Sequence, residues 1–269
     1  MRSDVASLPG SPERPNEDWA TTVLSAAEDR GALVLLDGVT PPAGDDGCVH
    51  GVPWFTARLG GTLTELSASR PDFSLSEILS TAIRRTAEAH RGTCDLSHVR
   101  TPQATVVLAR WDGAAVEHLV LSDSVLLLEA PDGAVRAVLD DRLDRVPVEV
   151  LRSVAATDRL RNREGGFFTA AADPAVAELA VTGTVPRAEV RALAALTDGA
   201  SRWVDLFGAG DWADCLGVLR AEGAPGLLRR VRERELADAA AGGVRRWKPH
   251  DDATAAFVEP GPGPELPGR

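Results

Sequence analysis

An apolar run stops on an aspartate and a glycine in the segment Gly31-Ala32-Leu33-Val34-Leu35-Leu36-Asp37-Gly38. A short apolar run bounded by turn residues is typical of a buried β-strand. A second β-like run, residues 19–25, precedes it, and the turn-prone segment Glu28-Asp29-Arg30-Gly31 separates the two. We therefore expect a hairpin whose two strands lead to one acidic tip.

A helical pair and a group of strands follow this hairpin. Apolar residues at helical spacing predict helices over 54–66 and 76–90. A strand meander comes next, in which two Asp-Gly pairs, at 112–113 and 132–133, are strong hairpin signals. The expected strands of this meander are 104–111, 116–121, 125–129 and 134–139.

The second half of the chain continues the alternation of strands and helices. Two apolar runs, 190–196 and 253–258, predict buried strands. The expected helices are 148–161, 174–179, 201–207, 212–220 and 224–240. Antiparallel strands interleaved with helical pairs predict an α+β domain whose helices cover the sheets from outside. We expect one domain over residues 1–259 and a disordered Pro/Gly-rich tail over 260–269.

Composition and charge argue against several classes of function. The 269 residues are 44% hydrophobic, enough for a substantial core, and the formal net charge of −11 with scattered arginines predicts no nucleic-acid binding. No apolar stretch is long enough to cross a bilayer, and residues 1–15 lack the apolar core of a signal peptide. These features predict a cytoplasmic protein with no membrane partner, and the Ala-, Arg- and Gly-rich composition suggests a bacterial source. The three cysteines are too few for a disulfide framework.

Acidic side chains stand where the expected strands begin or end. These residues are Asp37, Asp123, Asp198, Asp251 and the pair Glu17-Asp18. Carboxylates at strand ends supply the hard oxygen ligands that Mg²⁺ and Mn²⁺ prefer. Without a cation, these negatively charged groups repel one another. Any single Asp-Gly pair is more often an ordinary turn, so the interpretation depends on the order of the motifs along the chain.

That order resembles the metal-dependent protein phosphatase family, also called protein phosphatase 2C. The family has an arginine before an acidic tripeptide, Asp-Gly after a buried strand, a Thr-Ala segment, a Gly-Asp-Ser turn, Ser-Asp-Gly, and Asp-Asn before the last strand. The similar segments here are Arg14-Pro15-Asn16-Glu17-Asp18, Leu35-Leu36-Asp37-Gly38, Ala104-Thr105-Val106-Val107, Leu121-Ser122-Asp123-Ser124, Leu196-Thr197-Asp198-Gly199 and Asp251-Asp252-Ala253-Thr254. The resemblance spans residues 14–258.

The resemblance implies a four-layer αββα sandwich, two antiparallel sheets flanked by helices. It implies a phosphatase that hydrolyses phosphoserine and phosphothreonine monoesters in a phosphoprotein with two Mn²⁺ or Mg²⁺ ions. In this family the cations activate a water molecule that attacks phosphorus in line. On this pattern Asp37 would bridge both ions and Gly38 would donate its carbonyl oxygen to a metal. Glu17 would ligate one ion directly, and Asp198 with Asp251 would complete the other.

Three further residues carry roles by the same resemblance. Asp18 would orient metal-bound water, and Asp123 would contribute to a weaker third metal site. Arg14 would hold the substrate phosphate, although it lies one residue closer to the acidic pair than in the family, with Pro15 stiffening the link. Residues 162–173 occupy the place of a glycine-bearing family segment and are expected to form a structural strand or a flap over the site.

Several positions depart from the family pattern. The histidine that usually follows Asp-Gly is Val39, the small turn after it is Thr40-Pro41-Pro42, and the glycine of Gly-Asp-Ser is Ser122. Protonation of the leaving oxygen must then come from elsewhere, and His50 or His250 could supply it, although a lone histidine is more often solvated or packed.

Two alternatives to a protein phosphatase stay open. The same metal centre could act on a small phosphate ester, because substrate choice depends on loop shapes. The chain could also be a pseudophosphatase with a binding role, given the missing histidine and the altered turn. The retained acids at Glu17, Asp37, Asp198 and Asp251 argue against this last reading.

A second set of metal-binding residue types lies outside the aspartates. Cys48-x-His50 and His90…Cys94-x-x-x-His98 offer soft ligands in two clusters, which zinc would favour if the two loops met. The spacing matches no established zinc module, and a reduced cysteine is usually a small buried hydrophobe. The sequence alone favours the packing interpretation here.

Overall fold

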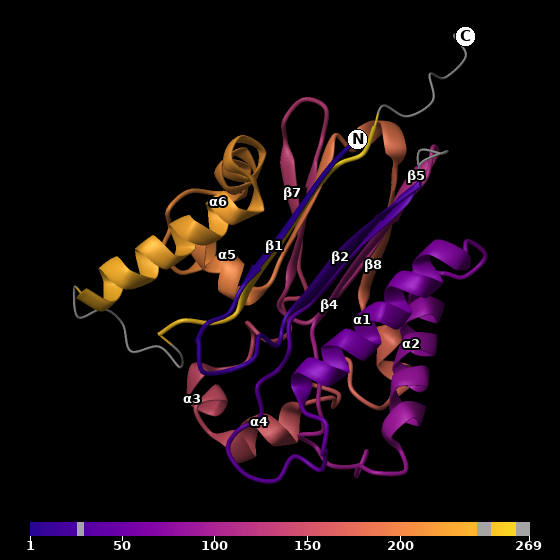
Figure 1. Cartoon of the computed structure of the whole chain (residues 1–269), viewed down its shortest axis with the longest axis vertical. Helices are drawn as coiled ribbons and strands as arrows, with labels where there is room; N and C mark the ends of the chain where they lie inside the picture. Colours follow the sequence, from indigo (N-terminus) through magenta and orange to yellow (C-terminus); the bar gives the residue numbers. More distant parts are fainter. Residues whose placement is uncertain (26–29, 241–248, 262–269) are drawn as a thin grey trace.

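Two five-stranded antiparallel sheets pack face to face, and helices cover the outer face of each (Figure 1). The computed structural model describes residues 1–25, 30–240 and 249–261. In the first sheet the order is β2 (Trp19–Leu24), β3 (Gly31–Leu36), β4 (Val106–Trp111), β5 (Ala115–Leu121) and β8 (Val181–Pro186). In the second it is β1 (Arg2–Leu8), β10 (Ala253–Glu259), β9 (Ala192–Leu196), β6 (Val125–Glu129) and β7 (Val135–Val138). The expected αββα sandwich is confirmed.

The helices form two separate layers. Helices α1 (Val52–Ser69) and α2 (Leu75–His90) pack on the first sheet. Helices α5 (Asp198–Asp205) and α6 (Trp212–Ala240) pack on the second. The short helices α3 (Val148–Leu151) and α4 (Val154–Leu160) lie beyond one end of the sheets, and two 3-10 turns, η1 (Pro174–Leu179) and η2 (Arg187–Glu189), flank β8 in the sequence. Among the described residues, no helix combines the length and hydrophobicity needed to cross a membrane.

Strand β3 explains why the apolar run is continuous. Leu33 and Leu35 point into the core between the sheets, whereas Val34 and Leu36 face the α1–α2 layer. Both faces of the strand are therefore buried, so every position carries an apolar side chain. Burial of each leucine contributes roughly 2 kcal/mol to stability before entropy costs. The hairpin with β2 is confirmed, with Trp19 paired to Leu36; residues 28 and 29 of its turn lie outside the described residues.

Both strands that the sequence did not reveal, β1 and β8, are edge strands. Strand β1 pairs only with β10, and β8 pairs only with β5. Edge strands expose part of their surface and carry fewer apolar residues, and β8 also contains Gly183 and Pro186. Their apolar signal is weak for that reason.

Several helix boundaries also differ from expectation. The expected helix 148–161 is broken into α3 and α4, because Ser153 leaves the helical conformation and caps the second helix through Ala156. Helix α5 begins at Asp198, before the expected residue 201. The expected helices 212–220 and 224–240 form one continuous element, α6. It has a break at Gly223, whose φ is 75°. Residues 262–269 of the expected tail lie outside the described residues.

Candidate metal centre

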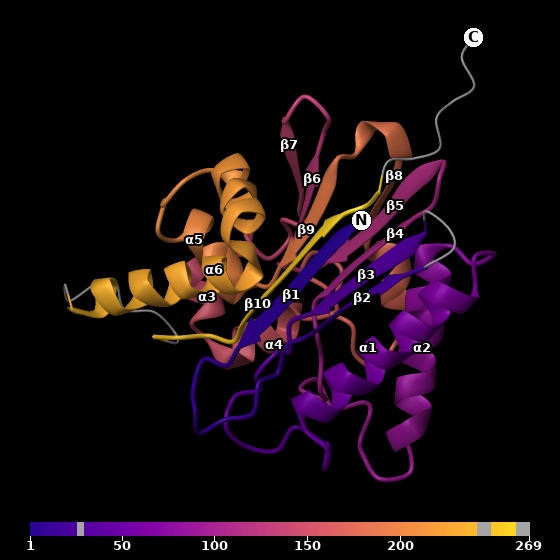
Figure 2. The ribbon, with the colours of Figure 1, turned by 45° about the horizontal axis from the view of Figure 1, so that its top comes forward.

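The acidic residues at the strand ends all lie at one end of the sandwich. Asp37 follows β3, Asp18 precedes β2, and Asp123 follows β5 in the first sheet. Asp198 follows β9 and Asp251 precedes β10 in the second. Because neighbouring strands are antiparallel, these ends fall on the same side, and the N-terminus of the chain lies at the opposite end of the sheets (Figure 2).

Asp37 lies at the centre of this cluster. One of its carboxylate oxygens accepts the backbone N–H of Asp198 at 3.3 Å, which joins the two sheets. Its own N–H donates to the Thr105 hydroxyl at 3.2 Å. Burial, followed by the negative charges of the other aspartates, raises the pKa of Asp37 well above its usual value. Those aspartates are Asp198, Asp18, Asp123 and Asp251.

Asp18 has one satisfied and one unsatisfied carboxylate oxygen. The hydroxyls of Thr197 and Thr254 donate to Oδ2 at 3.1 and 2.7 Å. Within the described part of the chain, Oδ1 is buried without a hydrogen-bond partner. Burial, together with the charges of Asp198 and Asp252, raises the pKa of Asp18 to about 8, although both hydroxyls oppose the rise. A buried carboxylate oxygen of this kind fits a cation or a water bound to a cation.

The turn at Asp123 keeps a glycine-like conformation although its first residue is serine. Ser122 has a φ of 70°, in the left-handed region that glycine adopts most easily. The Ser122 N–H donates to Asp140 at 2.8 Å, and its hydroxyl donates to Asp123 Oδ1 at 3.2 Å. Burial and then Asp198 raise the pKa of Asp123 to about 7. The serine thus preserves the turn and adds a hydrogen bond to the acidic residue.

Glu17 lies against the glycine that follows Asp37. A Cβ at Gly38 would lie 2.5 Å from the Glu17 carbonyl oxygen and 2.7 Å from its Cβ, so only glycine fits there. The Thr40 hydroxyl donates to Glu17 Oε2. Asp252 accepts the backbone N–H groups of Gly10 and Glu17, each at 2.7 Å, and thereby fixes the segment that carries Glu17.

No protein-family model matches the chain, and none of the curated proteins matches its sequence. Solved structures do match over nearly the full length. Serine/threonine phosphatase Stp1 from Staphylococcus aureus has a TM-score of 0.64 at 12% identity, with 100% of this chain and 96% of that chain covered. The catalytic domain of the serine/threonine protein phosphatase PstP, solved with two manganese ions, has a TM-score of 0.58 at 17% identity, with 96% and 97% covered.

PppA, a regulatory component of the type VI secretion system in Pseudomonas aeruginosa, has a TM-score of 0.56 at 19% identity, with 96% of each chain covered. The chain has the protein phosphatase 2C fold. The order of the sequence motifs and the arrangement of the two sheets and helical layers therefore indicate the same fold. At identities this low, the structural similarity shows the fold alone. An activity has to be argued from the residues of the site.

The acidic cluster of this phosphatase 2C fold has the donor set of a divalent-cation site. Its ligands are carboxylate and carbonyl oxygens, which suit Mg²⁺ and Mn²⁺ better than softer metals. The pKa values of Asp18, Asp37 and Asp123 are raised partly because other carboxylates are close, and a cation would relieve that repulsion. The residues present therefore fit the metals that the resemblance implies.

Two arginines near the cluster were not found from the sequence. Arg202 on α5 contacts Asp251 at 3.0 Å and buried Glu235 at 2.8 Å. Arg161, which follows α4, is largely buried; burial lowers the pKa of its guanidinium, and the carboxylates of Asp158 and then Asp123 raise it. Arginine is common along the chain, so neither residue carries a local signal.

The other expected site residues lie elsewhere or have other partners. Arg14 is exposed in the loop between β1 and β2, and no contact found among the described residues joins it to the acidic cluster. His250 contacts Glu235 at 2.7 Å, and His50 lies beside Cys94 at 3.3 Å. Neither histidine is thus held by the acidic cluster. The segment 162–173 forms no strand within the described residues; its Ala170 makes an isolated bridge to Ala104.

Proposed function

We propose that this chain is a metal-dependent phosphatase that hydrolyses phosphoserine and phosphothreonine monoesters. The observation that carries the proposal is the cluster of carboxylates from both sheets of a phosphatase 2C fold, with Asp18 Oδ1 buried and lacking a hydrogen-bond partner among the described residues. The neighbour PstP was solved with two manganese ions, which supports the choice of Mn²⁺ or Mg²⁺ for this chain. A single domain over residues 1–259 is part of the same proposal.

The proposed ligands are carried over from the family motifs to the acidic cluster of this chain. Asp37 would contact two ions, with the Gly38 carbonyl and Glu17 on one side and Asp198 with Asp251 on the other. When bound, two cations supply a water molecule of lowered pKa and neutralise the phosphoryl oxygens. Asp198 donates its N–H to Asp37 and so fixes the orientation of the Asp37 carboxylate.

The remaining residues of the cluster have supporting roles in this proposal. Asp18, held on one oxygen by two threonine hydroxyls, presents its other oxygen to orient water. Asp123 would contribute to a weaker third site. Arg14, exposed in the loop between β1 and β2, would bind the substrate phosphate, because a guanidinium can donate to two phosphoryl oxygens at once.

The test is an assay of the purified protein on phosphopeptides and p-nitrophenyl phosphate with Mn²⁺, with Mg²⁺ and with chelator. We expect activity only with added metal, and we expect Asp37→Asn and Asp198→Asn to lower kcat at least about 100-fold, because each removes a charge that holds a cation. Asp132→Asn is the matched control, because Asp132 lies in the exposed β6–β7 turn away from the cluster.

The result also separates the alternatives. Turnover of phosphometabolites with no turnover of phosphopeptides would favour a small-molecule phosphatase. Binding of Mn²⁺ without turnover of any ester would favour a pseudophosphatase. Full activity of the wild-type protein in chelator would contradict the metal mechanism.

A further inference from the structure

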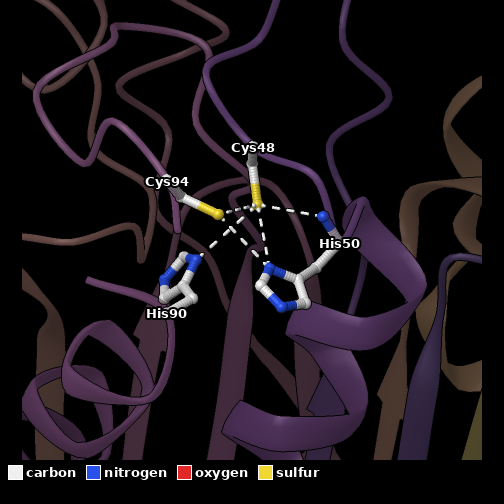
Figure 3. Close-up of side chains that lie close together, drawn as sticks. All are labelled: Cys48, His50, His90 and Cys94. Carbon is white, nitrogen blue, oxygen red and sulfur yellow. Dashed lines mark hydrogen bonds between the residues drawn. The ribbon is translucent and has the colours of Figure 1, made fainter. Parts of the chain in front are cut away.

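Two cysteines and two histidines, all of them possible metal ligands, meet beside the α1–α2 layer (Figure 3). Cys48 and His50 lie just before α1, whereas His90 ends α2 and Cys94 follows it by four residues. The two loops that the sequence left unconnected therefore do meet. His98 is not in this cluster, and His90 takes the fourth place instead. The Nδ1 of His98 accepts the Arg100 backbone N–H at 3.2 Å.

The four ligand atoms form a compact group within 4.8 Å of one another. The Cys48 sulfur lies 3.7 Å from His50 Nδ1 and 3.6 Å from His90 Nδ1. The Cys94 sulfur lies 3.3 Å from His50 Nδ1 and 3.2 Å from the Cys48 sulfur. Each side chain points its donor atom toward the same small space (Figure 3).

The three sulfur–nitrogen distances are close to the edges of a tetrahedral zinc site. Zinc bonds of about 2.3 Å to sulfur and about 2.05 Å to nitrogen place sulfur and nitrogen ligands roughly 3.6 Å apart. The same geometry places two sulfurs roughly 3.8 Å apart, so Cys48 and Cys94 would separate slightly on binding. Both cysteines are free thiols in the structure, as a metal site requires.

The surrounding residues hold the ligands in these positions. The ring of Trp54 stacks on His50, with centroids 4.2 Å apart. The His50 backbone N–H donates to the Cys48 sulfur at 3.4 Å. The Asp95 N–H donates to the Gly47 carbonyl at 2.8 Å and joins the two loops through their backbones. Ordered ligands bind a metal with less loss of conformational entropy.

We propose that Cys48, His50, His90 and Cys94 bind one structural Zn²⁺ ion that joins the loop before α1 to the end of α2. Two thiolates and two imidazoles select zinc over the Mg²⁺ or Mn²⁺ proposed for the aspartates. With four protein ligands the site has no open position, so its role is structural and not catalytic. The proposal does not depend on phosphatase activity.

The zinc site would also hold a loop that reaches the acidic cluster. Residues 39–51 connect Gly38 to α1, and this loop carries Thr40, whose hydroxyl donates to Glu17. One end of the loop is fixed by the backbone after β3, and the Cys48–His50 segment is the part nearest α1. Zinc would therefore restrain the loop from its far end.

Metal content is the first measurement. We expect one zinc per chain in protein purified with reductant and without added metal, and release of that zinc to a coloured chelator when the thiols are modified. In protein reconstituted with Co²⁺ we expect intense visible bands of a tetrahedral ion and thiolate-to-cobalt charge-transfer absorption. A carboxylate site cannot produce the charge-transfer absorption, so this readout distinguishes the two centres.

Variants locate the ion. Cys48→Ser and Cys94→Ser should each lose the charge-transfer absorption and most of the zinc, and both residues are only partly buried, so the fold should tolerate them. His98→Asn is the matched control and should retain one zinc per chain, because it alters a neighbouring histidine outside the cluster. Wild-type protein should melt at a lower temperature after zinc removal, and Cys94→Ser should show no such change.

Three outcomes would overturn the proposal. One is zinc that stays bound at full occupancy in the Cys48→Ser, Cys94→Ser double variant, since the ion would then lie elsewhere. Another is a cobalt spectrum without thiolate absorption. The third is a Cys48–Cys94 disulfide, found by mass spectrometry of alkylated protein purified with reductant, in a chain that holds no zinc.

Discussion

Asp18 shows at the scale of one residue how a proposed metal site would cost stability when no metal is bound. Its carboxylate is buried, its Oδ1 lacks a hydrogen-bond partner among the described residues, and its pKa is raised to about 8. The folded metal-free chain therefore binds a proton at Asp18 that the unfolded chain has already released near pH 4. Between these pH values the metal-free protein should lose stability as the pH rises.

We expect Asp18→Asn to reduce this pH dependence, leaving the part that comes from Asp37 and Asp123. In chelator at pH 8 the variant should be more stable than wild type by about 2 kcal/mol, because asparagine has no charge to bury and keeps an acceptor for Thr197 and Thr254. The two proteins should have similar stability near pH 4, where the aspartate is protonated. Urea unfolding across this pH range, in chelator, measures the effect; a wild type that gains stability from pH 4 to pH 8 relative to the variant would contradict it.

Ser122 illustrates why a motif can survive the loss of its glycine. The left-handed φ of 70° disfavours serine, but the serine hydroxyl adds a hydrogen bond to Asp123, and the backbone N–H of residue 122 keeps its bond to Asp140. Strain of this kind costs about 1 kcal/mol, which is comparable to one net hydrogen bond. The departure from Gly-Asp-Ser is thus compensated locally and does not displace Asp123.

At the scale of one element, strand β5 contains a buried histidine that makes the sheet sensitive to acid. His118 is 4% exposed, pairs with Gly183 of β8, and its Nδ1 has no hydrogen-bond partner among the described residues. Burial, and then the positive charge of Arg136, lowers the pKa of His118 from 6.5 to about 4. Folding therefore excludes a proton that the unfolded chain binds below pH 6.5, so the protein loses stability as the pH falls from 6.5 to 4.

We expect His118→Phe to reduce this acid sensitivity. Phenylalanine fills a similar volume and does not titrate, so the loss of stability between pH 6.5 and pH 4 should be smaller by up to ~3 kcal/mol. Thermal unfolding at several pH values, with His98→Phe as a partly exposed control on a loop, measures the difference. An unchanged pH profile in His118→Phe would show that other groups cause the acid response.

At the scale of the whole molecule, the acidic cluster joins the two sheets. Asp37 comes from the first sheet and Asp198 and Asp251 from the second, so the packing of one sheet on the other sets the distances between the carboxylates. The repulsion among them opposes that packing when no cation is present. Divalent metal should consequently stabilise the entire fold.

We expect Mn²⁺ to raise the melting temperature of the wild-type protein. Saturation at 100 times Kd adds ~2.7 kcal/mol per independent site. Asp37→Asn should lose most of this gain, whereas Asp132→Asn should retain it. Differential scanning calorimetry with a Mn²⁺ titration provides the measurement, in protein whose zinc content has been fixed beforehand. Equal shifts in wild type and Asp37→Asn would place the stabilising ion outside the cluster.

Local features of this chain were predictable because they depend on residues close in sequence. Both faces of β3 are buried, so a continuous apolar run in the sequence marks its position. The Asp-Gly pairs at 112–113 and 132–133 indicate hairpin turns through local backbone preferences, independently of how the sheets pack. The order of the strand-end acids predicted the fold. Their roles as metal ligands and the role of Arg14 stay predictions.

Other features were decided only by tertiary structure. The hydroxyls that hold Asp18 come from Thr197 and Thr254, 179 and 236 positions away, and no local pattern encodes such a contact. The same reason explains why His90, and not His98, completes the cysteine–histidine cluster. The sequence by itself thus determined which residue types stand at the strand ends, and the packing of two sheets and two helical layers decided which of them meet, because that packing brings distant segments into contact.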